Sequence, residues 1–526
     1  MLSALQAIRK NRTFIITLAI LLLLFYMAIQ GLETKDWVIT FLRGLSVGSV
    51  TFLVAAGFSL IFGLLDVLNL AHGTLFMIGA YIGWTVFVRP DTFIDLLTPA
   101  ALIVAGFALM PLWERILARV KAGSWTRLWP WLGLLVAAGV LFFSLSRYPI
   151  TKWNPEQYEN SPVTNAFLSD TGQFVLPEPE KFTGIPPWLG LSGILLGGVL
   201  IAFSLQGIMR RGEVHTPGTV TTPNTKAVRS AILLSTGITL LGLVIYFVNT
   251  PLTNWLFNFN SNGRFFIAVL MAALSGVALG GLMETSLIRP LYERPIYQLM
   301  LTLGLSAVGI EIVRQIWGRP EFVMPKPALF TGSGEGCPAK SLSALLTHHC
   351  STISILGGRV RTYNEIFIPL VGLVVLITVW LLLQRTRIGM VIRAGVQDRE
   401  MVEALGINVR RIFTLVFALG VGLAALGGVL AAPSMGLSTV MGDNLLLNAL
   451  IALAIGGLTS YPGAAAGSLL VGMIQQFIIK YGQVGIHLPF LTEPFKPSPP
   501  LVPASTVLLM VVILLALPHG LFGRKE

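Results

Sequence analysis

Few residues in this chain could do chemistry, and the first candidates are two charges inside a long apolar stretch. Glu311 and Arg314 stand three residues apart, so on a helix they occupy one turn and can pair with each other. Charges at membrane depth are costly unless they are paired or hydrated. The pair is therefore expected to be either a structural ion pair or part of a substrate path.

A second group of polar residues, Asp66, Asn69 and His72, lies in the segment LLDVLNLAHG between two apolar runs. Asp66 or Asn69 can cap the helix that follows, because both side chains accept hydrogen bonds from exposed helix N–H groups. A place in a substrate path is the alternative. His72 by itself makes neither a metal site nor a catalytic site.

The chain has only two cysteines, Cys337 and Cys350, and both lie in one hydrophilic segment between apolar runs. A lone pair in an outward-facing segment favours a disulfide. The neighbouring His348 and His349 leave a zinc site as an alternative, and two free thiols are a third. Structural zinc normally takes its ligands in two close pairs, and only one such pair is present.

Other catalytic patterns are missing from the sequence. It contains no nucleophile–base pair, no paired carboxylates and no metal-ligand cluster. The glycine-rich stretch 332–341 has Ala339 where a phosphate-binding loop needs glycine before its lysine. We therefore expect no enzymatic activity, no metal, and no cofactor or ATP bound by this chain itself.

The composition indicates that these residues are positioned by membrane helices. Hydrophobic residues make up 54% of the chain, charged residues 11%, and the mean hydropathy is +0.78. A soluble chain normally carries about 25% charged residues. The apolar runs are continuous, whereas strands of a membrane barrel would alternate. The sequence predicts an all-α, polytopic transmembrane bundle.

About 14 segments meet or approach the length of roughly 20 apolar residues that crosses the hydrocarbon. The two segments around 444–480 are candidates for half-spans. The first run follows three basic residues and could be a signal peptide, but a retained helix is favoured because no cleavage site follows. The predicted segments are 13–30, 44–64, 71–88, 99–113, 129–146, 187–205, 230–248, 265–287, 297–317, 366–384, 412–433, 444–457, 464–480 and 505–517.

Basic residues set the expected orientation, because they concentrate in cytoplasmic loops. With the N-terminus inside, the whole net charge of +12 falls on the segments assigned to the cytoplasm. The C-terminus is then cytoplasmic too. A basic cytoplasmic face accounts for the high pI of 9.9 without nucleic-acid binding.

The inner loop 385–411 is the most distinctive segment. Its apolar residues form a stripe at helical spacing on an otherwise charged segment, and Gly406 supplies a stop. Such a helix either rests on lipid or docks into a groove of a partner. Charges of mixed sign favour a protein partner. The residues expected to make this contact are Asp398, Arg399, Glu400, Glu403, Ala404, Leu405 and Gly406.

Residues 403–408, Glu-Ala-Leu-Gly-Ile-Asn, resemble the Glu-Ala-Ala…Gly coupling motif of bacterial ATP-binding-cassette importer permeases. The flanking sequence resembles the high-affinity branched-chain amino-acid permease family in particular. The resemblance covers roughly residues 44–90 and 264–523. Its segments are 64–81 (LLDVLNLAHGTLFMIGAY), 284–295 (ETSLIRPLYERP), 302–305 (TLGL), 386–411, 452–463 (ALAIGGLTSYPG) and 518–523 (PHGLFG).

This resemblance implies a permease subunit of the bacterial inner membrane that pairs with a second related permease. Two cytoplasmic ATPase subunits and a periplasmic substrate-binding protein complete such an importer. The family carries leucine, isoleucine and valine, and its relatives carry other amino acids, amides or urea. ATP binding by the partners would move the coupling helices and switch the cavity between outward-open and inward-open.

The expected organisation has three parts: residues 1–90, an insertion at 91–263 with four predicted spans, and residues 264–526 with the loop 385–411. Members of the family lack this insertion, and the sequence does not indicate its function. A competing interpretation is an ion-coupled secondary transporter or channel. It would explain the spans equally well but has no need of a coupling loop. A membrane enzyme is less favoured, since no catalytic constellation is present.

Overall fold

A computed structural model describes residues 32–118, 128–150, 182–213, 225–292, 294–318, 321–397, 399–407, 409–486 and 493–523. The predicted segment 13–30 lies outside the described residues. Each of the other thirteen predicted segments corresponds to a helix in the described part of the chain. Nine of these helices are long and apolar enough to cross a membrane, and four shorter apolar helices accompany them. The helical membrane fold is therefore confirmed.

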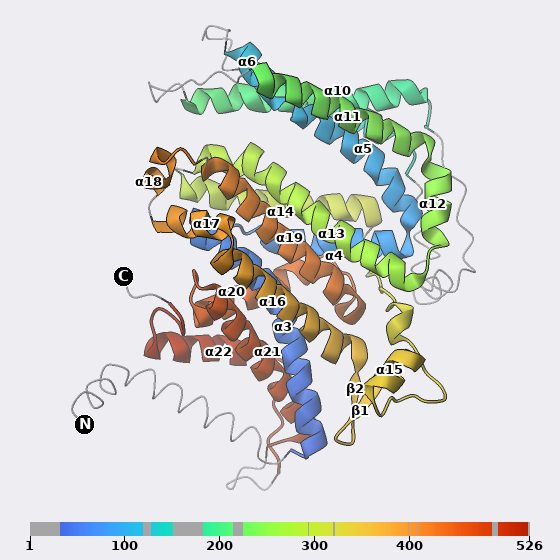
Figure 1. Cartoon of the computed structure of the whole chain (residues 1–526), viewed down its shortest axis with the longest axis vertical. Helices are drawn as coiled ribbons and strands as arrows, with labels where there is room; N and C mark the ends of the chain where they lie inside the picture. Colours follow the sequence, from blue (N-terminus) through green and yellow to red (C-terminus); the bar gives the residue numbers. More distant parts are fainter. Residues whose placement is uncertain are drawn as a thin grey trace, which may run out of the picture. The chain divides into compact units, whose positions relative to one another are not determined.

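The chain forms two compact units (Figure 1). One combines residues 1–84 with 265–526, and the other is residues 85–264. The chain passes between them within α4 (His72–Val88) and again within α13 (Ser261–Met283).

The core of the larger unit is built around α3 (Thr34–Leu65), which packs against α19 (Val409–Met435), α20 (Met441–Gly456) and α21 (Tyr461–Val484). Gly57 and Gly420 let α3 and α19 approach closely, because a Cβ on either glycine would overlap the carbonyl oxygen of the other.

The remaining helices of this unit are α14 (Pro295–Trp317), α16 (Ile368–Arg385), α17 (Arg387–Gln397), α18 (Arg399–Ala404) and α22 (Leu501–Ala516). Of the two segments around 444–480, α21 has 24 residues and is long and apolar enough to cross the hydrocarbon. Helix α20 has only 16 residues.

The hydrophilic segment after α14 has its own small fold. It contains α15 (Leu342–His348) and an antiparallel hairpin of β1 (Thr352–Ile355) and β2 (Gly358–Arg361). A short 3₁₀ turn, Ala328–Phe330, precedes them, and a π-helical turn, Thr362–Phe367, leads into α16.

The smaller unit consists of α5 (Pro90–Ala108), α6 (Met110–Leu117), α7 (Trp129–Leu145), α10 (Pro187–Glu213), α11 (Thr225–Phe247) and α12 (Asn249–Phe257). Helices α7 and α5 pack on α10, and α11 packs on α5.

The predicted span 99–113 is too short, because α5 and α6 together form one apolar span from Pro90 to Leu117. The predicted segment begins after the acids at 91 and 95. In the structure both acids are buried and satisfied: Arg89 Nε donates to Asp91 at 2.7 Å, and Asn249 Nδ2 donates to Asp95 at 2.7 Å. Buried charges are tolerated when they are paired in this way.

Candidate functional site

The segment between α16 and α19 forms two short helices, α17 and α18, beside the start of α19 (Figure 1). The hydroxyl of Thr386 caps α17 by accepting a hydrogen bond from the N–H of Gly389 at 3.0 Å. The apolar stripe predicted over this segment extends across both helices, which are separated at residue 398, outside the described residues.

The inward part of the stripe packs into the protein's own core. Ile392 of α17 and Val402 of α18 are buried together with Val409, Phe413 and Val416 of α19. This cluster fixes both short helices against a long membrane helix. Displacing α18 would therefore displace the start of α19 as well, because closely packed side chains transmit strain.

The outward part of the stripe is left on the surface. Met390 is 62% exposed, Met401 59% and Leu405 71%. Leu405 follows α18 directly, and Glu403 and Ala404 beside it are exposed too. An apolar surface mounted on a buried cluster and edged by a carboxylate suits contact with another protein.

Helix α18 ends in a defined left-handed turn at Gly406, whose φ of +78° agrees with the helix stop predicted there. The N–H of Gly406 donates to the carbonyl of Glu403 at 2.9 Å, and the N–H of Ile407 donates to the carbonyl of Val402 at 3.4 Å. These two bonds make a Schellman motif, and Ile407 packs against the cluster containing Val402. Nothing lies within 4 Å of the place a Cβ at Gly406 would occupy, so only the backbone conformation favours glycine.

The other predicted contact residues are described only in part. Asp398 lies outside the described residues. Arg399 and Glu400 belong to the first turn of α18.

A buried polar network that the sequence pattern does not predict lies next to this segment. The carboxylate of Glu284, which is fully buried, accepts two hydrogen bonds from Arg289, at 2.9 and 3.2 Å. It also accepts the hydroxyl of Tyr292 at 2.5 Å and that of Thr414 on α19 at 2.7 Å. Tyr292 packs edge-on against Phe413, so the network adjoins the buried cluster under α18.

The local backbone explains how Glu284 and Arg289 meet. Residues Glu284–Ile288 form a π-helical turn, continued by the 3₁₀ turn Arg289–Leu291. The wider π turn places residues five apart on one side, whereas an α-helix places residues three or four apart together. The segment ETSLIRPLYERP, which carries part of the family resemblance, contains both residues of this pair. Their spacing of five residues does not predict contact on a regular α-helix, so the sequence pattern does not indicate the pair.

The residues Asp66, Asn69 and His72 serve the connection between α3 and α4. Asp66 ends α3 in a left-handed conformation (φ 53°), with its N–H bonded to Phe62. The side-chain oxygen of Asn69 accepts the N–H of Ala71 at 3.2 Å, and its carbonyl accepts the N–H of His72. Asn69 thus occupies the capping place at α4.

His72 is fully buried, and its Nε2 lies 3.1 Å from the carbonyl oxygen of Val54. Among the described residues, no group of three or more potential ligands could hold a metal ion.

The remaining predicted residues lie elsewhere in the larger unit. Glu311 and Arg314 form an exposed ion pair of 3.3 Å on α14. Cys337 and Cys350 are disulfide-linked, with Cα atoms 5.5 Å apart.

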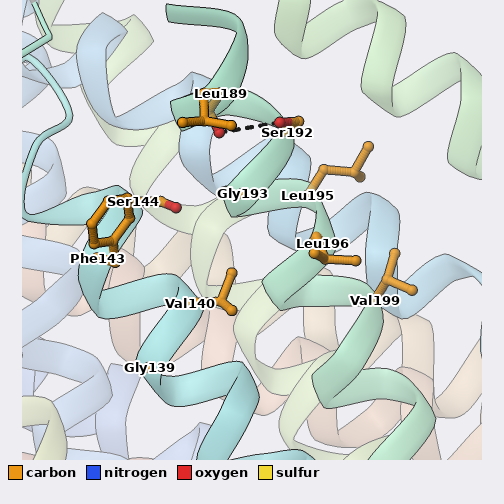
Figure 2. A pocket seen from close by; sticks show the side chains of 10 residues that line it. All are labelled: Gly139, Val140, Phe143, Ser144, Leu189, Ser192, Gly193, Leu195, Leu196 and Val199. Carbon is orange, nitrogen blue, oxygen red and sulfur yellow. Dashed lines mark hydrogen bonds between the residues drawn. The ribbon is translucent and has the colours of Figure 1, made fainter. Parts of the chain in front are cut away.

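A pocket in the smaller unit contains none of the predicted site residues. Figure 2 shows this apolar space of about 620 Å³ between α7 and α10, in which the Ser192 hydroxyl donates only to the carbonyl of Leu189, one turn earlier. It offers no charged group, so the segment 387–414 remains the candidate functional site.

Comparison with known proteins gives one family and several relatives. The profile of the family described as branched-chain amino acid transport system / permease component matches residues 227–517. The high-affinity branched-chain amino acid transport system permease protein BraD of Pseudomonas aeruginosa is 31% identical over 174 residues, covering 33% of this chain and 52% of that protein. Its counterpart LivH of Escherichia coli is 27% identical over 228 residues, covering 42% and 64%.

A more distant relative is matched over more of its length. The probable branched-chain amino acid transport permease protein LivH of Methanocaldococcus jannaschii is 22% identical over 296 residues, covering 54% of this chain and 87% of that protein. The chain thus spans between about half and two thirds of BraD and of the Escherichia coli LivH. No solved structure matches the chain.

Proposed function

Because its profile matches more than half of the sequence, this chain belongs to the branched-chain amino acid transport system / permease component family, and we propose that it is the membrane subunit of an ATP-driven amino-acid importer. The family consists of transport permeases, not enzymes. The relatives named above are permease proteins for branched-chain amino acids, which makes leucine, isoleucine and valine the first substrates to test.

One observation carries the mechanistic part of the proposal: the exposed apolar surface of Met401 and Leu405 stands on the buried cluster that joins α18 to α19. A cytoplasmic ATPase that binds this surface can displace α18. Because the buried cluster joins the two helices, α19 would move with it. Helix α19 packs directly on α3 at the centre of the unit. This chain would then undergo a conformational change that is driven by ATP bound to the partner subunits.

The proposed assembly contains a second permease subunit, two ATPase subunits and a periplasmic substrate-binding protein in the bacterial inner membrane. ATP binding and hydrolysis would alternate the substrate cavity between outward-open and inward-open states. An ion-coupled secondary transporter, the competing class, has no use for an exposed docking surface on a cytoplasmic loop.

Uptake by the assembled importer tests this proposal. The chain, co-expressed with its partner subunits and reconstituted in vesicles with loaded binding protein, should accumulate radiolabelled leucine only when the ATPase subunits have ATP. Collapsing the ion gradients should leave the initial rate unchanged. Uptake that needs an ion gradient and not ATP would refute the importer and favour the secondary transporter.

The orientation is part of the same proposal, with the N-terminus, the segment 385–411 and the C-terminus in the cytoplasm. Both native cysteines are disulfide-linked, so an introduced cysteine is the only reactive thiol. In intact cells, Asp398→Cys should resist an impermeant thiol reagent until the membrane is opened. Arg359→Cys, an exposed position on β2, should react at once. The reverse pattern would invert the proposed topology.

A further inference from the structure

Helix α14 divides into two faces, only one of which the protein covers. The covered face contains Gln298, Thr302, Gly309 and Val313. It contacts the start of α4, where Thr302 accepts a hydrogen bond from the N–H of Leu70 and Ser306 bonds Thr74 at 2.6 Å. The other face is exposed along its length, at Leu303, Gly304, Ala307, Val308, Glu311, Ile312 and Gln315.

Glu311 lies further from a helix end than any charged residue in four other membrane helices of the chain. The stretches 232–247 of α11, 265–283 of α13, 368–384 of α16 and 501–516 of α22 contain no charged residue. The exposed faces of these stretches therefore carry no charge, as contact with lipid favours. The exposed face of α14 instead carries Glu311, with a side chain 55% exposed, and Arg314, 38% exposed.

Of the two charges, Glu311 lies deeper in α14 than Arg314, which stands three residues before the helix end. Glu311 stands six residues before the helix ends at Trp317, which corresponds to about 9 Å along the axis. An exposed carboxylate at that depth needs water or a charged ligand beside it, because hydrocarbon does not solvate it. The part of this face around Glu311 is therefore suited to line an aqueous path.

We propose that Glu311 and Arg314 form a subsite on the translocation path that binds the charged end of a zwitterionic α-amino acid, an inference that rests on the function proposed above. The carboxylate of Glu311 receives the substrate ammonium group, and the guanidinium of Arg314 receives the substrate carboxylate. Charge-assisted hydrogen bonds of this kind are roughly twice as strong as those between neutral groups. The ion pair of 3.3 Å opens to exchange partners with the substrate, so net charge is conserved.

The neighbouring side chains match the rest of such a substrate. Val308 and Ile312, 58% and 51% exposed, lie on the same stripe as Glu311. They offer an apolar surface beside the two charges. A branched aliphatic amino acid has this combination of a dipolar end and an apolar side chain.

The test uses the reconstituted importer and records leucine uptake together with the ATPase rate stimulated by loaded binding protein. Glu311→Gln and Arg314→Gln should each lower uptake by roughly tenfold or more, because each leaves one substrate charge without its partner. Most of the stimulated ATPase rate should remain, since the coupling loop is intact. Lys35→Gln, which removes an exposed ion pair with Glu33, serves as the matched control and should leave uptake unchanged.

The double variant Glu311→Arg/Arg314→Glu separates recognition from structure. It keeps an ion pair but reverses its direction, so uptake should stay low. Uptake restored to near the wild-type level would show a purely structural pair and overturn the subsite. Unchanged uptake in the single variants would place this face against lipid or a partner, and joint loss of uptake and ATPase stimulation would indicate damage to the fold; either overturns it. A wild-type complex without ATP-dependent uptake would instead refute the proposed function, and the subsite with it.

Discussion

Replacing Gly406 by valine should uncouple the importer while leaving the membrane helices folded. Gly406 has φ +78°, a conformation that costs a β-branched residue about 1–3 kcal/mol. The strain should break the hydrogen bonds of the Schellman motif and shift Leu405, which is more exposed than Met401 in the apolar surface that the two residues form. We expect leucine uptake and the substrate-stimulated ATPase rate to fall together by roughly tenfold or more.

The matched control is Gly406→Asn, because asparagine adopts the left-handed conformation more readily than other residues with side chains. It should retain most of the activity. The side chain itself has room, since nothing lies within 4 Å of the Cβ position, so any difference between the two variants reports on the backbone. Equal, wild-type activity in both would exclude this turn as a coupling element.

Glu403→Lys tests the same surface without changing the backbone. Glu403 is exposed on the last turn of α18, and reversing its charge should weaken docking of an ATPase subunit. Binding of substrate to the separate periplasmic protein should survive, as should membrane insertion. Wild-type ATPase stimulation in this variant would mean that the partner docks elsewhere.

The second large effect is expected at Arg289. Replacing it by methionine leaves the fully buried carboxylate of Glu284 without its countercharge. Breaking a buried ion pair from one side typically costs about 3–5 kcal/mol. We expect a lower yield of folded protein and a midpoint of thermal unfolding in detergent several degrees below wild type.

Two variants show whether the uncompensated charge is the cause. Glu284→Gln/Arg289→Met removes both charges, while the amide can still meet Tyr292 and Thr414, so part of the stability should return. Arg314→Gln, which breaks an exposed pair, should change the midpoint little. If Arg289→Met unfolds at the wild-type temperature, the network does not stabilise the fold.

The sequence by itself determined the fold class and the position of most membrane helices. The hydrocarbon imposes a length and an apolar composition on each crossing, and both can be read along the chain without knowing any neighbour. Thirteen of the predicted segments are helices for this reason. The family was recognisable too, because its motifs are short and continuous, and the stop at Gly406 follows from the local backbone preference of glycine.

Tertiary structure alone decided which face of each helix is buried. Spacing marked the stripe in 385–411 as apolar, but only packing against α19 separates buried Val402 from exposed Leu405. The same holds for Glu284: its partner Thr414 lies 130 residues away, and a π-helical turn brings Arg289 within reach.

The burial of two acidic residues, Asp95 and Glu311, also depends on tertiary structure, and it differs between them. Asp95 stands before the predicted segment 99–113, yet the amide of Asn249 on α12, 154 residues away, lets it lie inside a span. Glu311 and Arg314 looked like an ordinary local pair, and only the uncovered face of α14 shows that they are exposed. Hydropathy depends on each residue and its near neighbours, whereas burial and pairing of charges depend on segments brought together by folding.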